Sequence, residues 1–265
     1  MQAFAYATPK TLADAVKLAA EEDAKYMAGG QTLLQSMKLG LIAPSTVIDL
    51  AAISEIKGVC RTGDRSGNAI VIGGGATHAE VAASADLQAA IPALADLAGH
   101  IGDRQVRNRG TLGGSLANND PAACYPAAVL GLGATVHTNQ RKIAADHFFV
   151  GMFTTALNEG EIVTAVSFPI PEKAGWQKFK QPASRFSLVG VFVSKGPAGV
   201  RVAVTGAGAG GVFRASGLEA LLAANYSAAA LAGATVHADD LNSDLHGSAA
   251  YRAALIPVLA ARAVS

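Results

Sequence analysis

Residues 107–120 read R-N-R-G-T-L-G-G-S-L-A-N-N-D, in which three glycines stand beside two hydroxyl side chains. These five residues are Gly110, Thr111, Gly113, Gly114 and Ser115. Because glycine has no Cβ, such a loop lets a ligand approach bare backbone N–H groups. Successive N–H groups in a turn form a concave surface that binds anions. The stretch therefore predicts a loop that holds a phosphate or a pyrophosphate.

A second glycine turn lies upstream, after the short apolar run Tyr26–Met27 and before the amphipathic run Leu33–Leu39. It consists of Ala28, Gly29, Gly30, Gln31, Thr32 and Leu33. This order is typical of a strand, a turn and a helix, and the N-terminus of a helix also favours anions. Two such turns predict one diphosphate held from both sides. The competing interpretation is that both are ordinary tight turns in a glycine-rich chain.

The composition is that of a well-buried globular protein. The 265 residues allow one large domain or two modest ones, and 51% of them are hydrophobic and 15% charged. A net charge of +1 gives no electrostatic basis for binding nucleic acid. We find no good membrane span, and Met1–Lys10 lacks the basic and apolar regions of a secretion signal. These features predict a cytoplasmic protein.

The two cysteines, Cys60 and Cys124, lie far apart in the sequence. They form no disulfide framework, which fits a reducing compartment. They are also too few for an iron–sulfur cluster, which requires about four thiolates. The six histidines form no cluster with cysteines or carboxylates at metal-ligand spacing. The sequence therefore predicts no metal site.

Three segments carry a family resemblance by their order and spacing, namely Ala28–Leu33, Ile72–His78 and Arg107–Ala123. Together they resemble the FAD-binding medium subunit of molybdenum hydroxylases, the enzymes related to xanthine dehydrogenase and aerobic carbon monoxide dehydrogenase. The resemblance continues through Phe153–Val163, Phe179–Phe186 and Ser248–Arg252, and so covers nearly the whole chain. The run Asn119–Pro126 leans weakly toward the carbon-monoxide-dehydrogenase-like branch.

The resemblance implies an α+β fold of two domains. A two-lobed FAD-binding domain of the vanillyl-alcohol-oxidase (PCMH) type would cover residues 1–172, with lobes of about 1–55 and 56–172. A C-terminal domain like that of carbon monoxide dehydrogenase flavoproteins would cover residues 173–265. The alternation of apolar residues predicts a three-stranded antiparallel sheet there, followed by helices, with strands over Trp176–Gln181, Leu188–Lys195 and Val200–Gly206. Gly196–Gly199 would form a turn of this sheet.

The resemblance also implies that FAD lies between the two lobes, with its pyrophosphate on the two glycine turns. The implied cofactor-binding residues are Ala28, Gly29, Gly30, Gln31, Thr32, Leu33, Ile72, Gly73, Gly74, Thr77, Gly110, Thr111, Gly113, Gly114, Ser115, Asn118, Asp120, Cys124, Ile162, Val163 and Lys180. No catalytic residue and no metal ligand is expected.

Several of these positions have a second interpretation. Thr77 begins a capping box and is a helix cap whatever else it does. Ile162 and Val163 match positions that pack near the flavin ring, but as strand residues they would be apolar anyway. Lys180 matches a lysine that approaches the isoalloxazine, where a cation would stabilise the anionic reduced flavin. An exposed strand lysine is an equal alternative.

Cys124 departs from the common family pattern, in which an aspartate contacts the adenosine ribose. A thiol is a weak hydrogen-bonding group, so either this contact is lost or Asp120 supplies it. Cys124 itself is expected to be a small buried residue. Asp120 is also a candidate N-cap of a helix with Pro121 at its first position.

Three further features are assigned structural roles. The run Gly206–Gly211 spells G-x-G-x-x-G, but too few residues follow for a doubly wound nucleotide domain, so it is interpreted as a glycine-rich strand end. The segment Gly63–Gly67 predicts a hairpin turn. Arg107 and Arg109 are assigned a structural or subunit-contact role, because the family's phosphate contacts are mostly made by backbone.

The resemblance implies a relay function within a heterotrimer or its dimer. A large subunit would hydroxylate the substrate at a molybdopterin site, and a small subunit would carry [2Fe–2S] clusters. This chain would pass electrons from the small subunit to an external acceptor. One alternative is a self-sufficient FAD reductase or oxidase of the same fold, for which we find no catalytic-acid motif. Another is a cofactor-free interaction subunit with degenerate glycine turns.

Overall fold

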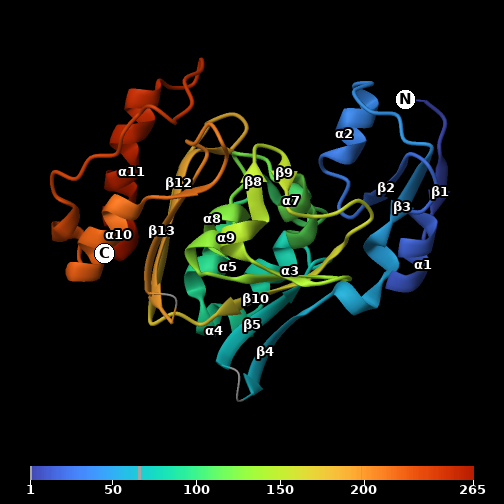
Figure 1. Cartoon of the computed structure of the whole chain (residues 1–265), viewed down its shortest axis with the longest axis horizontal. Coiled ribbons are helices and arrows are strands. Elements are labelled where there is room, and N and C mark those ends of the chain that lie inside the picture. Colours follow the sequence, from blue (N-terminus) through green and yellow to red (C-terminus); the bar gives the residue numbers. More distant parts are fainter. Residues whose placement is uncertain (1, 65–66, 198) are drawn as a thin grey trace.

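The computed structural model describes residues 2–64, 67–197 and 199–265 (Figure 1). The chain runs through an N-terminal lobe, a central body and a C-terminal unit, which follow one another from blue to red in Figure 1. The predicted turns at Gly63–Gly67 and Gly196–Gly199 each include positions outside the described residues. The flanking strands do pair as antiparallel hairpins, as predicted.

The described residues of the N-terminal lobe form a parallel sheet of three strands in the order β1-β3-β2, with two short helices. The Thr11 hydroxyl accepts a hydrogen bond from the Asp14 N–H and so caps the first helix, as the sequence predicts. The lobe consists of β1 (Ala5–Ala7), α1 (Leu12–Leu18), β2 (Ala24–Met27), α2 (Leu33–Lys38) and β3 (Thr46–Asp49).

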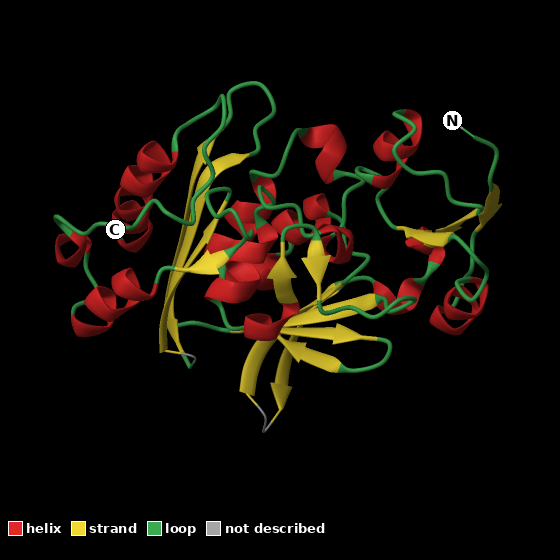
Figure 2. Cartoon of the chain, turned by 45° about the horizontal axis from the view of Figure 1, so that its top comes forward, coloured by secondary structure: helices red, strands yellow, loops and turns green. Residues whose placement is uncertain are grey.

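The central body is built on an antiparallel sheet of five described strands in the order β4-β5-β10-β6-β7. These strands are β4 (Val59–Asp64), β5 (Gly67–Gly73), β6 (Thr135–Thr138), β7 (Lys142–Ala144) and β10 (Val163–Pro169). Short helices lie over the sheet (Figure 2), and a small hairpin, β8 (Phe149–Gly151) and β9 (Thr154–Thr155), stands beside them. The helices are α3 (His78–Ala83), α4 (Ala85–Ala90), α5 (Pro92–Gly99), α6 (Arg104–Arg107), α7 (Leu112–Asn118), α8 (Tyr125–Gly131) and α9 (Ala145–Phe148).

One cap predicted from the sequence is confirmed in the body and another is wrong. Thr77 and Glu80 form the predicted capping box of α3. Helix α8, however, begins at Tyr125 and not at Pro121, and the Asp120 carboxylate accepts a hydrogen bond from the Ala122 N–H within a turn. The reason is tertiary, because the C-terminal sheet binds the carbonyl oxygens of this turn. Thr205 Oγ1 donates to Pro121 O at 3.0 Å.

The C-terminal unit contains an antiparallel sheet of four described strands, where the sequence predicted three. The additional strand β14 is only two residues long, so no alternating pattern in the sequence marks it. The unit consists of β11 (Lys173–Lys180), β12 (Ser187–Gly196), β13 (Gly199–Thr205), β14 (Phe213–Arg214), α10 (Ser216–Ala224), the 3₁₀ helix η3 (Ala228–Leu231) and α11 (Ala249–Val264). Gly206–Gly211 joins β13 to β14, which confirms the strand-end interpretation.

Both faces of the C-terminal sheet are covered (Figure 2). On one face Val189, Val191 and Val193 pack against α10 and α11. On the other, Trp176 and Phe192 join the core of the central body. The body and the C-terminal unit therefore share one core, and the division at residue 172 remains an expectation.

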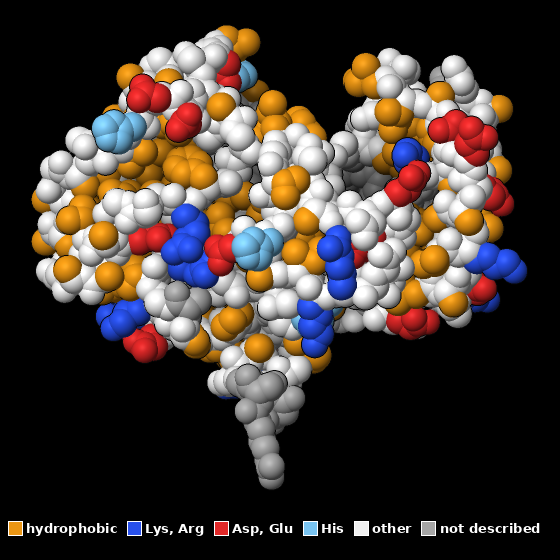
Figure 3. Space-filling model, in the orientation of Figure 1, with side chains coloured by type: hydrophobic (Ala, Val, Ile, Leu, Met, Phe, Trp, Pro, Cys, Tyr) orange, Lys and Arg blue, Asp and Glu red, His pale blue; other side chains and the backbone are white. Residues whose placement is uncertain are grey.

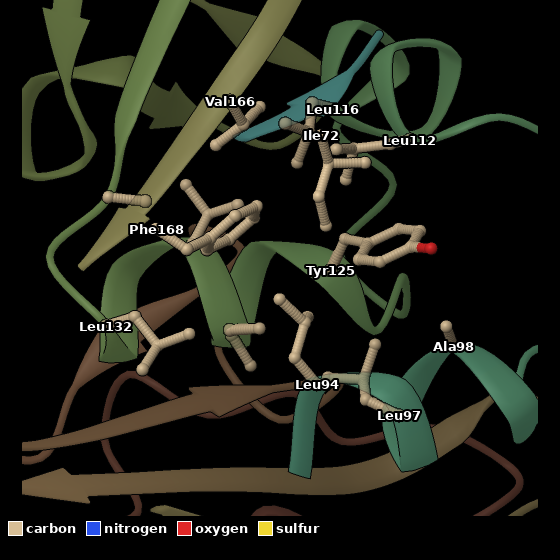
Figure 4. Close-up of a cluster of buried hydrophobic side chains, with 14 of the residues drawn as sticks. Ile72, Leu94, Leu97, Ala98, Leu112, Leu116, Tyr125, Leu132, Val166 and Phe168 are labelled. Atoms are coloured by element: carbon tan, nitrogen blue, oxygen red, sulfur yellow. The ribbon is translucent and has the colours of Figure 1, made fainter. Parts of the chain in front are cut away.

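The core of the body anchors the glycine segments (Figure 4). Ile72 precedes the glycines at the end of β5, and Leu112 and Leu116 belong to α7. All three side chains are buried and point toward one cluster with Tyr125 and Leu94. Burial of such side chains fixes the backbone of both segments from below. Within the described ranges, every helix is too short or too polar to span a bilayer.

Candidate cofactor site

Three glycine segments far apart in the sequence meet where the N-terminal lobe joins the central body. A Cβ at Gly29 would lie 2.1 Å from Arg109 O, and one at Gly113 would lie 2.8 Å from Gly74 O. A Cβ at Gly74 would lie 2.1 Å from the carbonyl oxygen of Val163. Since each of these atoms belongs to backbone, only glycine allows the segments to approach this closely. We call this meeting point the glycine junction.

Backbone hydrogen bonds hold two of the segments together. The His78 N–H donates to Gly110 O at 2.9 Å, and the Leu112 N–H donates to Ala76 O at 3.0 Å. The Gly113 N–H donates to Gly74 O at 2.8 Å. The result is a short antiparallel bridge centred on Thr77 and Thr111. The loop after β5 and the loop before α7 therefore form one rigid platform.

The third segment, the N-terminal turn, keeps its backbone N–H groups free of hydrogen bonds to described residues. The N–H groups of residues 29–33 make no hydrogen bond to any described part of the chain. Gly30 adopts a φ of +70°, a conformation that favours glycine and curls this turn. No acidic side chain lies within the turn, and Gln31 and Thr32 are exposed. Successive backbone N–H groups without partners, here five, can together bind an anion.

The N-terminal turn (residues 28–33) and the central loop (residues 110–115) also touch each other. A Cβ on Gly114 would lie 3.6 Å from the Ala28 Cβ and 3.0 Å from Thr111 Oγ1, which accepts a hydrogen bond from the Gly114 N–H. Figure 3 shows the surface hollowed between the N-terminal lobe and the rest of the molecule. Free donors and Cβ-free backbone fit a phosphate-bearing cofactor that enters between the lobes. The residues present therefore fit the diphosphate that the sequence predicts.

Most of the predicted residues lie in this junction or in its support. Ile72, Gly73, Gly74, Gly110, Thr111 and Gly113 are buried, whereas Ala28, Gly30, Leu33, Thr77, Gly114, Ser115 and Asn118 are partly exposed. Ile162 and Val163 are buried core residues, and Val163 O contacts Gly74. These contacts agree with the structural interpretation of the two residues, in which they are apolar because they pack in the core.

Cys124 and Lys180 lie toward the C-terminal sheet. Cys124 is buried, as expected, and its Sγ lies 3.6 Å from Ser187 Oγ on β12. Lys180 is exposed at the end of β11, and its side chain makes no hydrogen bond to a described residue. Lys178, two residues earlier, is half-buried, and its Nζ donates to His100 O at 3.1 Å and to Cys124 Sγ at 3.3 Å. Sequence reasoning missed Lys178, because strand alternation places residues two apart on one face and so does not distinguish the two lysines.

His78 is a second residue that sequence reasoning missed, although it ends the motif Ile72–His78. A Cβ on Gly110 would lie 2.6 Å from His78 Nε2, and the ring packs 5.3 Å from the ring of Tyr125. Burial, with the nearby Arg107 charge, lowers the pKa of His78 to about 4. At neutral pH this ring is therefore uncharged, and it packs against Gly110 of the platform.

Arg107 makes contacts within the chain, in line with the structural role that was one of the two expected for it. Its Nη1 donates to Ile101 O at 3.2 Å and to Gly102 O at 3.3 Å, so it closes the loop before α6. Among the described residues, no group of three or more histidine, cysteine or acidic side chains has the arrangement of a metal site.

Comparison with known proteins gives a consistent relationship. Residues 2–171 match the family described as the FAD binding domain in molybdopterin dehydrogenase. The chain is 36% identical to the nicotine 6-hydroxylase medium subunit of Paenarthrobacter nicotinovorans, over 100% of this chain and 97% of that protein. It is 31% identical to the carbon monoxide dehydrogenase medium chain of Hydrogenophaga pseudoflava, over 99% and 96% of the two chains.

Comparison with solved structures gives the same family relationship. A chain of the reconstituted CO dehydrogenase from Oligotropha carboxidovorans superposes with a TM-score of 0.88 at 29% identity, covering 99% of this chain and 96% of the other. A chain of quinoline 2-oxidoreductase from Pseudomonas putida 86 gives a TM-score of 0.87 at 27% identity, with the same coverage. Fold, glycine junction and family match coincide over the whole FAD-binding region. The chain therefore belongs to the family of FAD-binding medium subunits of molybdopterin-dependent oxidoreductases.

Proposed function

We propose that this chain relays electrons from a [2Fe–2S] subunit to an external acceptor, through an FAD whose diphosphate lies on the glycine junction. The five free N–H groups of residues 29–33 are the observation that carries the proposal. They would hold one side of the diphosphate. The loop Gly110–Ser115 would hold the other side, because the two turns touch at Ala28 and Gly114.

Each part of the junction then has a task. Gly30, with a φ of +70°, would curl the N-terminal turn around the phosphates, and Gly114 lets the two turns approach each other at Ala28. Thr77 and Thr111 bridge the platform and keep the central loop in place. His78 supports Gly110 as a neutral ring and adds no competing charge. When bound, FAD would supply the redox chemistry, accepting and releasing electrons at its isoalloxazine.

Partners are part of the proposal because relatives of this chain are named as medium subunits of larger enzymes. The described residues hold no metal-ligand cluster, and both cysteines are free and far apart. Relatives of similar length are named as medium chains of carbon monoxide and glyceraldehyde dehydrogenases. A large molybdopterin subunit and a small [2Fe–2S] subunit, in a heterotrimer or its dimer, would complete the path in the cytoplasm.

Anaerobic bleaching of the flavin band tests the relay. The isolated chain should stay oxidised when substrates of these hydroxylases are added, and should bleach with a chemical reductant. The chain mixed with its iron–sulfur and molybdenum subunits should bleach when substrate is added. Substrate-driven bleaching of the isolated chain would instead establish a self-sufficient flavoenzyme.

A further inference from the structure

A cavity of about 380 Å³ lies where helices α3 and α6 meet the end of α5 (α3 and α5 are labelled in Figure 1). Alanines of α3 and Gly99 form an apolar wall, and Arg104, Arg107 and Asn108 form a polar one. All of these lining residues lie outside the glycine junction, and none of them is acidic. We call this hollow the arginine cavity.

Small residues keep the arginine cavity open. Ala79, Ala82 and Ala83 are three and four residues apart, so they share one face of α3. A Cβ on Gly99 would meet only the Cβ of Ala82, at 3.9 Å. The two arginines therefore border a shallow apolar surface that no larger side chain fills.

The two arginines of the cavity retain hydrogen-bond donors. Arg107 is held in place through Nη1, which donates to Ile101 O and Gly102 O, but its Nε and Nη2 make no hydrogen bond to a described residue. The Arg104 side chain makes neither a hydrogen bond nor an ion pair with a described residue, and only its carbonyl oxygen is used, by Asn108 Nδ2 at 2.8 Å. Both guanidinium groups can therefore bind a further acceptor.

The acidic side chains on the same helices are engaged elsewhere. Glu80 closes the capping box of α3, and Asp103 accepts a hydrogen bond from the Val106 N–H at 2.8 Å. Asp96 on α5 lies 3.2 Å from His100 Nδ1. None of these carboxylates lines the cavity. Two positive charges thus lie side by side without a counter-charge from the described chain.

Another part of the chain shows what two neighbouring arginines bind. Arg201 and Arg214 both contact Asp146, with Arg201 Nη2 at 2.8 Å from Oδ2 and Arg214 Nη1 at 3.5 Å from Oδ1. There a single carboxylate of the chain lies between two guanidinium groups. At the arginine cavity, the corresponding anion would have to come from outside the described chain.

We propose that the arginine cavity binds the phosphate group of a small molecule, with Arg104 and Arg107 on the phosphate oxygens. A phosphate dianion matches two guanidinium groups in charge and in acceptors, whereas one guanidinium already satisfies a carboxylate. Inorganic phosphate shares this chemistry, but the alanine wall favours an ester whose apolar part lies against α3. This site is separate from the diphosphate site of the glycine junction and does not depend on the relay function.

Calorimetric titration of the FAD-loaded chain tests the site, because bound FAD would already occupy the glycine junction. We expect phenyl phosphate to bind at one site per chain, inorganic phosphate to bind the same site more weakly, and acetate not to bind. Tighter binding of inorganic phosphate would support the phosphate site but identify the free ion as its ligand. Equal binding of acetate and phosphate, or binding of neither phosphate, would overturn the proposal.

Matched variants locate the bound phosphate. Arg104→Gln should weaken phenyl phosphate binding roughly tenfold or more, because a charged donor is lost. Arg262→Gln, at an exposed arginine of α11, is the control and should bind as the parent does. Ala83→Glu would supply an internal carboxylate, as Asp146 does for its two arginines, and should abolish binding, whereas Ala83→Gln should not. Unchanged affinity in Arg104→Gln would contradict the assignment.

The assembled complex distinguishes a small molecule from a partner subunit as the occupant. The chain in complex with its partner subunits should bind phenyl phosphate as the isolated chain does. Loss of the site in the complex would show that a partner covers the cavity and would overturn the proposal. A chain that binds no flavin would remove the relay function, whereas the effect of Arg104→Gln on phosphate binding would still decide the arginine cavity.

Discussion

The chain has two glycine-rich places that look alike in the sequence and differ in the structure. At the glycine junction, Gly29, Gly74 and Gly113 lie against backbone from distant segments. In the run Gly206–Gly211, a Cβ at Gly206 would also meet backbone, Ser187 O at 2.4 Å, whereas Gly210 and Gly211 have no atom within 4 Å of an added Cβ. Donors differ as well, since the Gly206 and Ala209 N–H groups bind Pro121 O and Asp240 O, whereas those of residues 29–33 have no partner among the described residues. A glycine motif therefore indicates a binding site when its backbone N–H groups remain free, whereas neither its spacing nor a close backbone approach is enough.

The largest expected contrast is between Gly113→Ala and Gly210→Ala. The added methyl at position 113 would lie 2.8 Å from Gly74 O, so the platform must shift, at a cost of about 2–3 kcal/mol in the free energy of unfolding and a loss of FAD. The methyl at position 210 meets nothing, and stability should change by less than about 0.5 kcal/mol. Thermal unfolding and flavin absorbance of both variants measure this. Equal effects of the two would erase the distinction between the regions.

Acid should loosen the junction before it loosens the C-terminal run. The pKa of His78 is about 4 in the folded chain and about 6.5 when unfolded, so unfolding takes up a proton between these values. The contribution of neutral His78 to the free energy of unfolding is therefore fully present above pH 6.5. It is lost as the pH drops toward 4, by on the order of 2–3 kcal/mol. Unfolding in urea at pH 7 and pH 5 checks this, and His78→Gln should flatten the dependence.

The structure around Gly206–Gly211 should lose stability in a different pH range. Arg252 Nη1 donates to Gly206 O at 2.8 Å, and Arg252 is paired with Asp244. Burial raises the pKa of Asp244, but hydrogen bonds from the His246 N–H and Arg252, with the Arg252 charge, outweigh it and hold this pKa below the usual range. A carboxylate with a lowered pKa stabilises the fold above its unfolded pKa of about 4 and loses this contribution only in stronger acid. Loss of C-terminal structure at pH 5 ahead of flavin release would reverse the predicted order.

Gly114→Ala should affect binding more than folding. Its methyl would meet only side-chain atoms, Thr111 Oγ1 at 3.0 Å and the Ala28 Cβ at 3.6 Å, so the backbone can stay in place. It would narrow the contact between the two turns, and we expect FAD affinity to fall roughly tenfold with the unfolding free energy within about 1 kcal/mol of the parent. Titration of the apoprotein with FAD measures this. Unchanged affinity would show that the diphosphate lies elsewhere.

The smallest effect concerns the two lysines of β11. Lys180→Met should leave FAD occupancy near normal and lower the flavin reduction potential if Lys180 approaches the isoalloxazine. Lys178→Met, which removes a contact with Cys124 Sγ and His100 O, is the comparison at the half-buried lysine of the same strand. Anaerobic redox titration of both variants separates them. An unchanged potential in Lys180→Met would identify Lys180 as an exposed strand lysine.

The sequence was informative where structure follows from short segments. Both glycine turns, the capping box at Thr77 and the long strands Leu188–Lys195 and Val200–Gly206 could be predicted, because backbone chemistry and alternation are local. The start of α8 could not, since the turn after Asp120 is set by hydrogen bonds from Thr205, far along the chain. His78 escaped for the same reason. A buried polar residue acquires its role from the segments packed around it.

The identity and amount of flavin released on denaturation test the central claim most directly. A diphosphate held between two glycine turns requires FAD, because FMN carries a single phosphate and lacks the adenosine half. We expect the purified chain to be yellow and to release about one equivalent of FAD, with none from the Gly113→Ala variant. Release of FMN, or no flavin bound after incubation with FAD, would contradict the account.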